Sequence, residues 1–180
     1  MSIDDLFTTR RSVVTGLATA AFCAANTPAK SAALTTAPKA EDERLMREAI
    51  ALATKADFPF GAVITRDGTI LARGLNLGKR RHDPTAHGEM VAIRRFLAEH
   101  GPDKLKGTTL YTSGEPCVMC MGAILWCGIG RVVYAASIAQ LSAHIGQIAI
   151  SCTEIANKAP FAKIEITGGV LAAEAIKLFS

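Results

Sequence analysis

The spacing of apolar residues predicts helices and strands in alternation through most of the chain. Over 41–56, apolar positions recur near helical spacing behind acidic residues, which predicts a helix of about four turns. Two apolar runs within 60–76 flank Asp67-Gly68, a dipeptide typical of hairpin turns. A second helix is predicted over 87–101, because its apolar residues share one face and it ends at a glycine.

The second half of the chain continues this alternation. Short apolar runs predict strands over 108–113, 131–136 and 162–169. Helices are expected over 117–128, 137–147 and 170–179. Strands interleaved with helices after an opening hairpin predict the α/β class, as a three-layer α/β/α sandwich around a five-stranded mixed sheet.

The first forty residues follow a different pattern. Arg10 and Arg11 precede an apolar stretch over 12–25, and the small residues of 31–33 would suit a signal peptidase. This order is typical of an export signal, and the arginine pair resembles a twin-arginine leader. An ordinary N-terminus that carries two arginines is the alternative.

These boundaries divide the chain into three parts. We predict an export signal over 1–33, a linker over 34–40 and one catalytic domain over 41–180. The leader predicts a periplasmic or exported protein, with a cytoplasmic location as the alternative.

Composition narrows the class of protein. With 49% hydrophobic and 20% charged residues, the chain is typical of a globular protein. The net charge of +4 is too small to indicate a protein that coats nucleic acid. Five cysteines, an odd number, favour metal binding or buried thiols over a disulfide scaffold. No apolar run is long enough to predict a spanning helix in the mature domain.

Two short stretches carry the candidate chemistry. Pro116 can open a helix, which would place Cys117 and Cys120 one turn apart near its N-terminus, where thiolates are favoured. His87 follows another helix-start pattern. Two thiolates and one imidazole would hold zinc with one tetrahedral position open, as in catalytic zinc sites.

Glu89 lies two positions after His87 and would point near such a metal without binding it. A carboxylate there can take a proton from water whose pKa the zinc has lowered. Each stretch alone has a simpler interpretation. His87 with Glu89 fits the start of a surface helix, and Cys117 with Cys120 fits a redox pair, or a disulfide in an exported protein. Together the two stretches favour one hydrolytic zinc site.

The motifs HGE and PCVMC resemble those of the zinc-dependent cytidine deaminase superfamily. Its branch with guanine deaminase, fungal-type cytosine deaminase and bacterial tRNA adenosine deaminase is similar to this chain from Glu41 to Phe179. The resemblance implies the family's five-stranded fold, a homodimer, and zinc bound by His87, Cys117 and Cys120. It also implies that Glu89 protonates a ring nitrogen and then the leaving ammonia.

The same resemblance suggests two substrate contacts. Asn76 matches the family's base-contacting asparagine, although a plain turn residue is the alternative. Trp126 resembles an aromatic residue of guanine deaminases, although a helix tryptophan is more often part of the core. Gly88 departs from the alanine that is usual in the tRNA and guanine enzymes, which weakens a choice of substrate on this segment.

The sequence therefore predicts a zinc-dependent hydrolase that removes an amino group, as ammonia, from a small nucleobase or nucleoside. Guanine is favoured and cytosine is next, because an exported enzyme would meet small amino-heterocycles rather than transfer RNA. The alternatives are a tRNA adenosine-to-inosine deaminase, for which nucleic acid would be the partner, and a non-catalytic zinc or redox module. The sequence assigns no role to Cys127 or Cys152, beyond a buried thiol for Cys127.

Overall fold

The computed structural model describes residues 33–179 of the chain. Residues 1–32 of the predicted export signal lie outside the described residues, so the leader stays a prediction. Within the described range, no helix combines the length and the apolar character that crossing a membrane requires.

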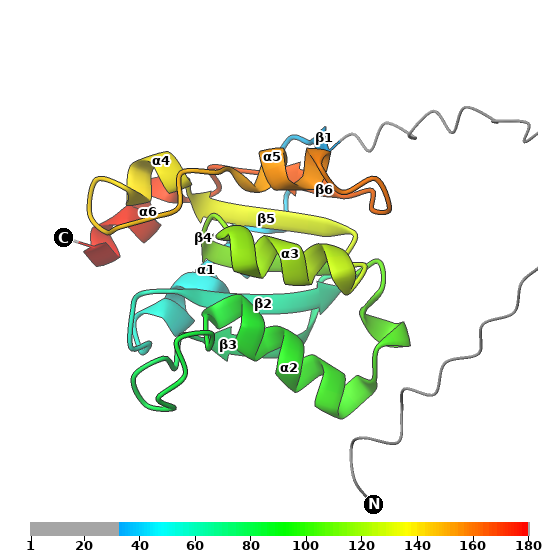
Figure 1. The fold of residues 1–180 in the computed structure, drawn as a ribbon, viewed down its shortest axis with the longest axis horizontal. Coiled ribbons are helices and arrows are strands. Elements are labelled where there is room, and N and C mark those ends of the chain that lie inside the picture. Colours follow the sequence, from blue (N-terminus) through cyan, green and yellow to red (C-terminus); the bar gives the residue numbers. More distant parts are fainter. Residues whose placement is uncertain (1–32, 180) are drawn as a thin grey trace, which may run out of the picture.

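Helices and strands alternate along the described chain, as the hydrophobic pattern predicts (Figure 1). The strands are β1 (Leu34–Thr35), β2 (Gly61–Arg66), β3 (Thr69–Leu75), β4 (Thr109–Gly114), β5 (Arg131–Ala136) and β6 (Glu165–Thr167). The α-helices are α1 (Asp42–Ala53), α2 (Gly88–His100), α3 (Val118–Trp126), α4 (Ile138–Leu141), α5 (Cys152–Asn157) and α6 (Ala172–Ile176). Two 3₁₀ turns, Asp103–Leu105 and Lys177–Phe179, complete the set.

The strands form one mixed sheet in the order β1-β6-β5-β4-β2-β3. The hairpin strands β2 and β3 are antiparallel, β2 runs antiparallel to β4, and β4, β5 and β6 are parallel. The α/β prediction is confirmed, but the sheet has six strands where the sequence predicts five. The extra strand β1 falls in the predicted linker, and two residues are too few to give a periodic signal. Its backbone pairs with the open edge of β6, where Leu34 N–H donates to Ile164 O at 3.1 Å.

The core has two halves because strand side chains alternate between the two faces of the sheet. Ala62 and Ile64 of β2 pack in one half with α2, α3 and α5. Val63, between them, packs in the other half with α1 and α6. Figure 1 shows the same arrangement, with α2, α3 and α5 on the near face of the sheet and α1 and α6 behind it. The predicted three-layer sandwich is therefore confirmed.

The segment after β5 differs from the predicted single helix over 137–147. Helix α4 ends at Leu141, and a second short helix, α5, begins at Cys152. Each begins with a serine capping box, at Ser137 and at Ser151. Helices of four and six residues contain too few apolar repeats to be recognised from their spacing.

The closing helix predicted over 170–179 is also shorter. Leu171 adopts a left-handed conformation with φ of 57°, and α6 follows it over five residues before a 3₁₀ turn. The chain turn at Leu171 therefore delays the start of the helix.

The topology brings several chain segments to one end of the sheet. The parallel strands β4 and β5 end there, at Gly114 and Ala136, and α2 and α3 begin close by (Figure 1). In α/β sheets, ligands bind at the carboxyl ends of the strands. Close packing also fixes the start of α2: a Cβ on Gly74 of β3 would lie 2.1 Å from Gly88 O, so only glycine permits this approach.

Candidate metal centre and active site

The three predicted zinc ligands meet at this end of the sheet. His87 is the N-cap of α2 and Cys117 is the N-cap of α3, both with extended backbone and neither with a side-chain cap bond. Cys120 lies in the first turn of α3 and is fully buried. The sequence predicts that Pro116 opens this helix. Because Cys117 is the cap, Pro116 instead precedes the helix. The structure brings all three predicted ligands together within 4.8 Å.

The distances among the three fit zinc. Both sulfur atoms, of Cys117 and of Cys120, lie 3.6 Å from Nδ1 of His87. A tetrahedral ion with Zn–S of about 2.3 Å and Zn–N of about 2.05 Å requires sulfur and nitrogen about 3.6 Å apart. The donor set of two sulfurs and one imidazole is also one that zinc prefers. These residues can therefore hold zinc and leave one position for a fourth ligand.

The two thiols have different electrostatic environments. Hydrogen bonding from the Cys120 thiol and then from His87 lowers the pKa of Cys117 to about 4. The Cys117 thiolate in turn raises the pKa of His87. The same thiolate, together with burial, raises the pKa of Cys120 well above its usual value. One thiolate is thus available at neutral pH, and the second ligand must lose a proton to bind metal.

Zinc binding should therefore depend on pH. Because Cys120 must release its proton, we expect zinc affinity to rise with pH by about tenfold per unit for each proton released. Competition titrations against a chromophoric chelator between about pH 6 and pH 8 would measure this. An affinity that does not change over that range would contradict the protonated state of Cys120.

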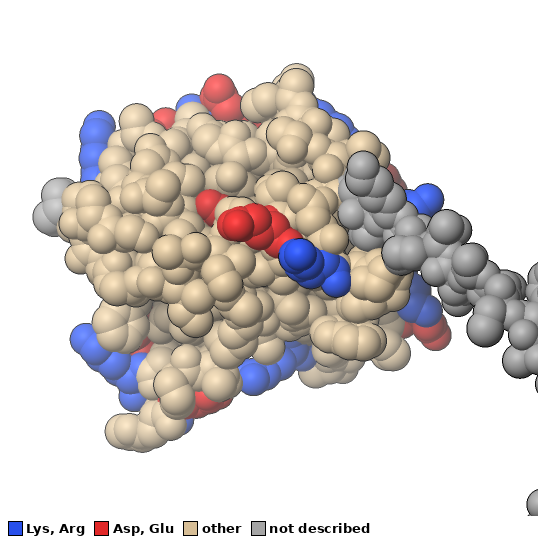
Figure 2. Space-filling model, turned by 45° about the horizontal axis from the view of Figure 1, so that its top comes forward, with Lys and Arg blue, Asp and Glu red and all other residues tan. Residues whose placement is uncertain are grey.

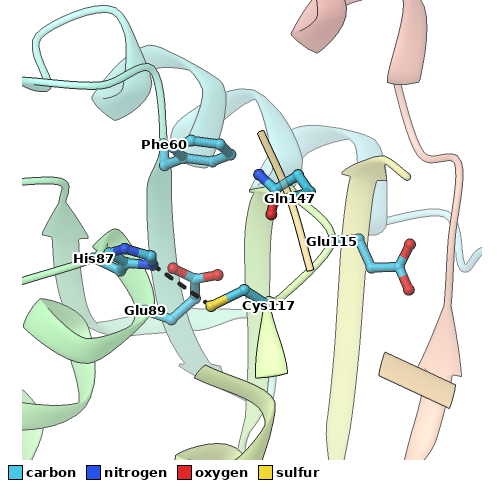
Figure 3. A pocket seen from close by; sticks show the side chains of 6 residues that line it. All are labelled: Phe60, His87, Glu89, Glu115, Cys117 and Gln147. Carbon is cyan, nitrogen blue, oxygen red and sulfur yellow. Dashed lines mark hydrogen bonds between the residues drawn. The ribbon is translucent and has the colours of Figure 1, made fainter. Parts of the chain in front are cut away.

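Glu89 lies in the first turn of α2, beside the metal group, and is only 4% exposed. Burial raises the pKa of its carboxyl group to about 7. Figure 3 shows this carboxyl group between the His87 ring and the Cys117 sulfur. A buried carboxyl group that titrates near neutrality is suited to accept and donate a proton.

Asn76 lies at the end of β3, and the structure brings it to the same site. Together with His87 it lines a hollow of about 320 Å³, a volume at the lower end of the range for small-molecule sites of roughly 300–1,000 Å³. Its Oδ1 accepts the Gly78 N–H at 3.0 Å, and the side chain is buried. The NH₂ group of Asn76 therefore stays available as a donor to a ligand.

Trp126 is not brought to the metal group. It lies at the C-terminal end of α3, is 78% exposed, and stacks on Phe161 with ring centroids 4.5 Å apart. Since the metal ligands lie at the opposite end of α3, this ring is not placed to contact a base there within one chain. The predicted substrate contact of Trp126 has no support from its position.

A second, smaller pocket of about 30 Å³ lies at the metal group, and three residues that the sequence did not single out line it. They are Phe60, Glu115 and Gln147, which Figure 3 shows around His87, Glu89 and Cys117. Glu115 stands directly before Pro116 and the first cysteine, so its position in the motif was a usable signal. Gln147 comes from the loop between α4 and α5, which no local pattern links to the site.

The remaining described cysteines are free thiols. Cys152 is fully buried at the start of α5, and Cys127 is half-buried at the end of α3. Burial raises the pKa of both thiols. The buried thiol expected at Cys127 is therefore only partly enclosed.

Comparison with known proteins agrees with this geometry. Residues 39–136 match the family model for the cytidine and deoxycytidylate deaminase zinc-binding region. This range contains all three candidate ligands, Glu89 and Asn76.

Two similar proteins are named for different deaminase activities. The chain is 51% identical over 78 residues to a guanine deaminase of Bacillus subtilis, a match that covers 43% of this chain and 50% of that protein. The chain thus spans about half the length of this relative. It is 39% identical over 148 residues to a tRNA-specific adenosine deaminase of Buchnera aphidicola, covering 77% of this chain and 86% of that one.

A solved structure shares the fold. It is a protein in complex with 2,6-diaminopurine, which is 26% identical and superposes with a TM-score of 0.66 over 77% of this chain and 79% of its own. The two relatives carry different activities in their names, and the solved structure holds a purine, so these comparisons do not fix one substrate.

Proposed function

Because the chain belongs to the family defined by the cytidine and deoxycytidylate deaminase zinc-binding region, we propose that it is a zinc-dependent hydrolase that deaminates a nucleobase or nucleoside. Guanine is the favoured substrate and cytosine is next. The observation that carries the proposal is the buried Glu89 carboxyl group beside the group of His87, Cys117 and Cys120. A site that only stored metal would not need this acid.

The reaction adds water to an amino-bearing ring carbon and releases ammonia. His87, Cys117 and Cys120 would hold zinc, which when bound would supply Lewis acidity and lower the pKa of water toward neutrality. Glu89 accepts a proton from the attacking water and delivers it to the adjacent ring nitrogen. After the new C–O bond has formed, Glu89 takes the proton of the new hydroxyl group and transfers it to the amino group. The C–N bond then breaks, the hydroxyl oxygen becomes a carbonyl oxygen, and ammonia leaves.

The rest of the pocket orients the base. The NH₂ group of Asn76 can donate to a carbonyl oxygen or ring nitrogen on the base edge. The Phe60 ring, which forms one wall of the pocket (Figure 3), offers an apolar surface to the base. Guanine is favoured because the Bacillus relative, named a guanine deaminase, has the higher identity over the matched segment.

Ammonia release by the zinc-loaded protein tests the proposal. The panel would contain guanine, cytosine, adenine, their nucleosides and a tRNA anticodon stem-loop. Turnover of guanine above the other compounds would support the proposal. Turnover of a different free base would support the deaminase activity but replace guanine as the substrate. Silence over the whole panel, with zinc bound, would contradict it.

A tRNA adenosine-to-inosine deaminase is the second candidate. The match to the Buchnera enzyme extends over a larger share of both proteins than the match to the guanine deaminase, which favours this reading. Activity confined to the stem-loop would select it, and nucleic acid would then be the partner.

We also propose that the protein is exported through its arginine-pair leader. A route that carries folded proteins would allow zinc to load onto reduced Cys117 and Cys120 before the chain meets an oxidising compartment. Cell fractionation tests this proposal: a protein found only in the cytosol, with its leader intact, would contradict it and would favour the tRNA candidate.

A homodimer is the third part of the proposal. Large apolar side chains are exposed along α3 and beside it, namely Met119, Trp126, Ile148, Ile150 and Phe161. Figure 2 shows a face with charged side chains mainly at its edges and one small acid–base group near its middle. An exposed apolar face of this kind marks an interaction surface, and a two-fold dimer would bury the same face of both copies.

Trp126→Glu should convert such a dimer to a monomer, because it places a charge on the apolar face at its most exposed aromatic ring. Size-exclusion chromatography with light scattering would measure the change in mass. Thr69→Glu, on the exposed strand β3, is the matched control and should leave the mass unchanged. A wild-type protein that is already monomeric at micromolar concentration would contradict the proposed dimer.

A further inference from the structure

Glu115 lies at the pocket but does not face the metal group. It is only 7% exposed, and its backbone N–H donates to Ala136 O, at the end of β5, at 2.7 Å. Figure 3 shows its carboxylate turned away from His87 and Glu89. Because burial of a carboxylate is costly without hydrogen-bond donors, its partners must lie on the side away from the metal group.

Both oxygens of this carboxylate accept backbone hydrogen bonds from later parts of the chain. Oε2 accepts the N–H of Ile138, the first residue of α4, at 2.8 Å. Oε1 accepts the N–H of Cys152, the first residue of α5, at 2.8 Å. The serine caps of the two helices bond N–H groups further along each first turn. Glu115 thus joins the starts of two helices to the strand end that precedes Cys117.

The chain between these two anchors is the loop of residues 142–151, and it reaches the metal site. Gln147 lines the pocket together with His87 and Glu89, and Figure 3 shows its amide directed into the pocket. Gly146, Gln147 and Ile148 also line the hollow beside Cys117. In the described chain, no backbone acceptor bonds the N–H groups of Gly146–Ala149. The segment Gly146–Ala149 is therefore held by what flanks it, namely Ile145, which packs against the core, and the helix starts that Glu115 bonds.

We propose that Glu115 is a positioning residue, which fixes the loop of residues 142–151 and thereby holds the Gln147 amide over the substrate pocket, where Gln147 reads the edge of the base. This inference rests on the proposed function. A carboxamide offers one acceptor and two donors, so it can bond a carbonyl oxygen and a ring N–H of a purine at the same time. Accurate placement of such a group matters because a loosely held side chain loses the benefit of its hydrogen bonds.

Three variants and one control test the proposal. Glu115→Gln keeps the size of the side chain but places an NH₂ group against one of the two N–H donors. Gln147→Ala removes the amide from a loop, and the third variant combines both changes. Glu154→Gln is the control, because Glu154 accepts from Ser151 N–H at the start of the same α5 but has no link to β4.

Hydrogen exchange tests the anchoring without reference to activity. In Glu115→Gln, the amides of Ile138, Cys152 and residues 142–151 should exchange faster, whereas those of β4 and α2 should not. Glu154→Gln should change at most the exchange of the Ser151 N–H, which Glu154 accepts directly, and should leave residues 142–150 unchanged. Unchanged exchange in Glu115→Gln would overturn the anchoring role.

Steady-state kinetics test the action through Gln147. Each single variant should raise KM for the preferred base about tenfold, the effect of one lost hydrogen bond, with kcat and zinc content nearly unchanged. The double variant should be no worse than either single variant, since Glu115 acts through Gln147. A rise in KM of about a hundredfold in the double variant, as expected for two independent effects, would overturn the proposal.

Failure of the proposed function would look different. If the wild-type protein turned over no base, the role of Gln147 in reading a substrate would be overturned together with that function. The exchange experiment would still decide whether Glu115 fixes the loop.

Discussion

Replacing Glu89 by glutamine should lower ammonia release by about 10²–10⁴-fold, the range typical of a lost general acid–base group. Glutamine fills the same volume but can neither take the proton from water nor pass it to the ring nitrogen. Steady-state assays on the preferred base would measure the loss, and metal analysis should find the zinc content unchanged. Because Glu89 lies beside the three ligands and is not one of them, activity and metal content should separate.

Glu99→Gln is the matched control for this variant, since Glu99 lies on the exposed side of the same helix. It should retain full activity. If Glu89→Gln retained activity, Glu89 would not be the proton carrier. If Glu89→Gln lost its zinc, Glu89 would belong to the metal site itself, and the non-catalytic zinc module would gain support.

Replacing Asp42 by alanine should destabilise the protein by about 3–5 kcal/mol, the cost of leaving a buried partner charge uncompensated. Asp42, at the start of α1, accepts two hydrogen bonds from Arg131 of β5, at 2.8 and 2.7 Å, and both side chains are buried. It also accepts from Tyr111 Oη at 2.8 Å and from Lys39 N–H at 2.7 Å. Urea unfolding would measure the change in the free energy of unfolding.

Asp103→Ala is the control, because its ion pair with Lys106 is exposed on both sides and should contribute less than about 1 kcal/mol. If both variants lowered the free energy of unfolding by the same small amount, the buried pair of Asp42 and Arg131 would not be a major source of stability. The loss in Asp42→Ala should leave zinc binding intact in the folded fraction, because the pair lies in the half of the sheet packed against α1.

The same pair should make stability depend on pH in the acid range. Burial opposes ionisation of Asp42, but hydrogen bonds from Arg131, Lys39 N–H and Tyr111 outweigh it and hold its pKa below the usual value. A lowered pKa contributes stability above the pKa of the unfolded chain, and this stability is lost as pH falls through the folded value. Wild-type unfolding free energy should therefore drop more steeply than that of Asp42→Ala as pH falls below about 4.

The local patterns of the sequence predicted most of the fold and the metal site. The hairpin around Asp67-Gly68 and the long helix after His87 depend on neighbouring residues, so their periodicity is visible in the chain itself. The ligands were recognisable for the same reason. Cys117 and Cys120 lie within one helical turn, and Glu89 lies in the first turn after His87.

Contacts between distant segments could not be predicted in this way. Strand β1 exists because β6 offers an unpaired edge to two residues that have no pattern of their own. The first N–H groups of α4 and α5 donate to the carboxylate of Glu115, which lies more than twenty positions before α4. Trp126 shares α3 with Cys120, yet it lies at the opposite end of that helix and is exposed.

By itself, then, the sequence predicted the α/β class, which the structure confirms, and identified His87, Cys117, Cys120 and Glu89 as candidate site residues, which the structure brings together. Each of these depends on residue type and on spacing within one or two helical turns, which local backbone geometry converts directly into position. Only the tertiary structure decided that the two motifs meet at one end of the sheet. It alone brought Gln147 over the pocket and buried Glu89 deeply enough to raise its pKa to about 7, because burial depends on every segment packed around a group.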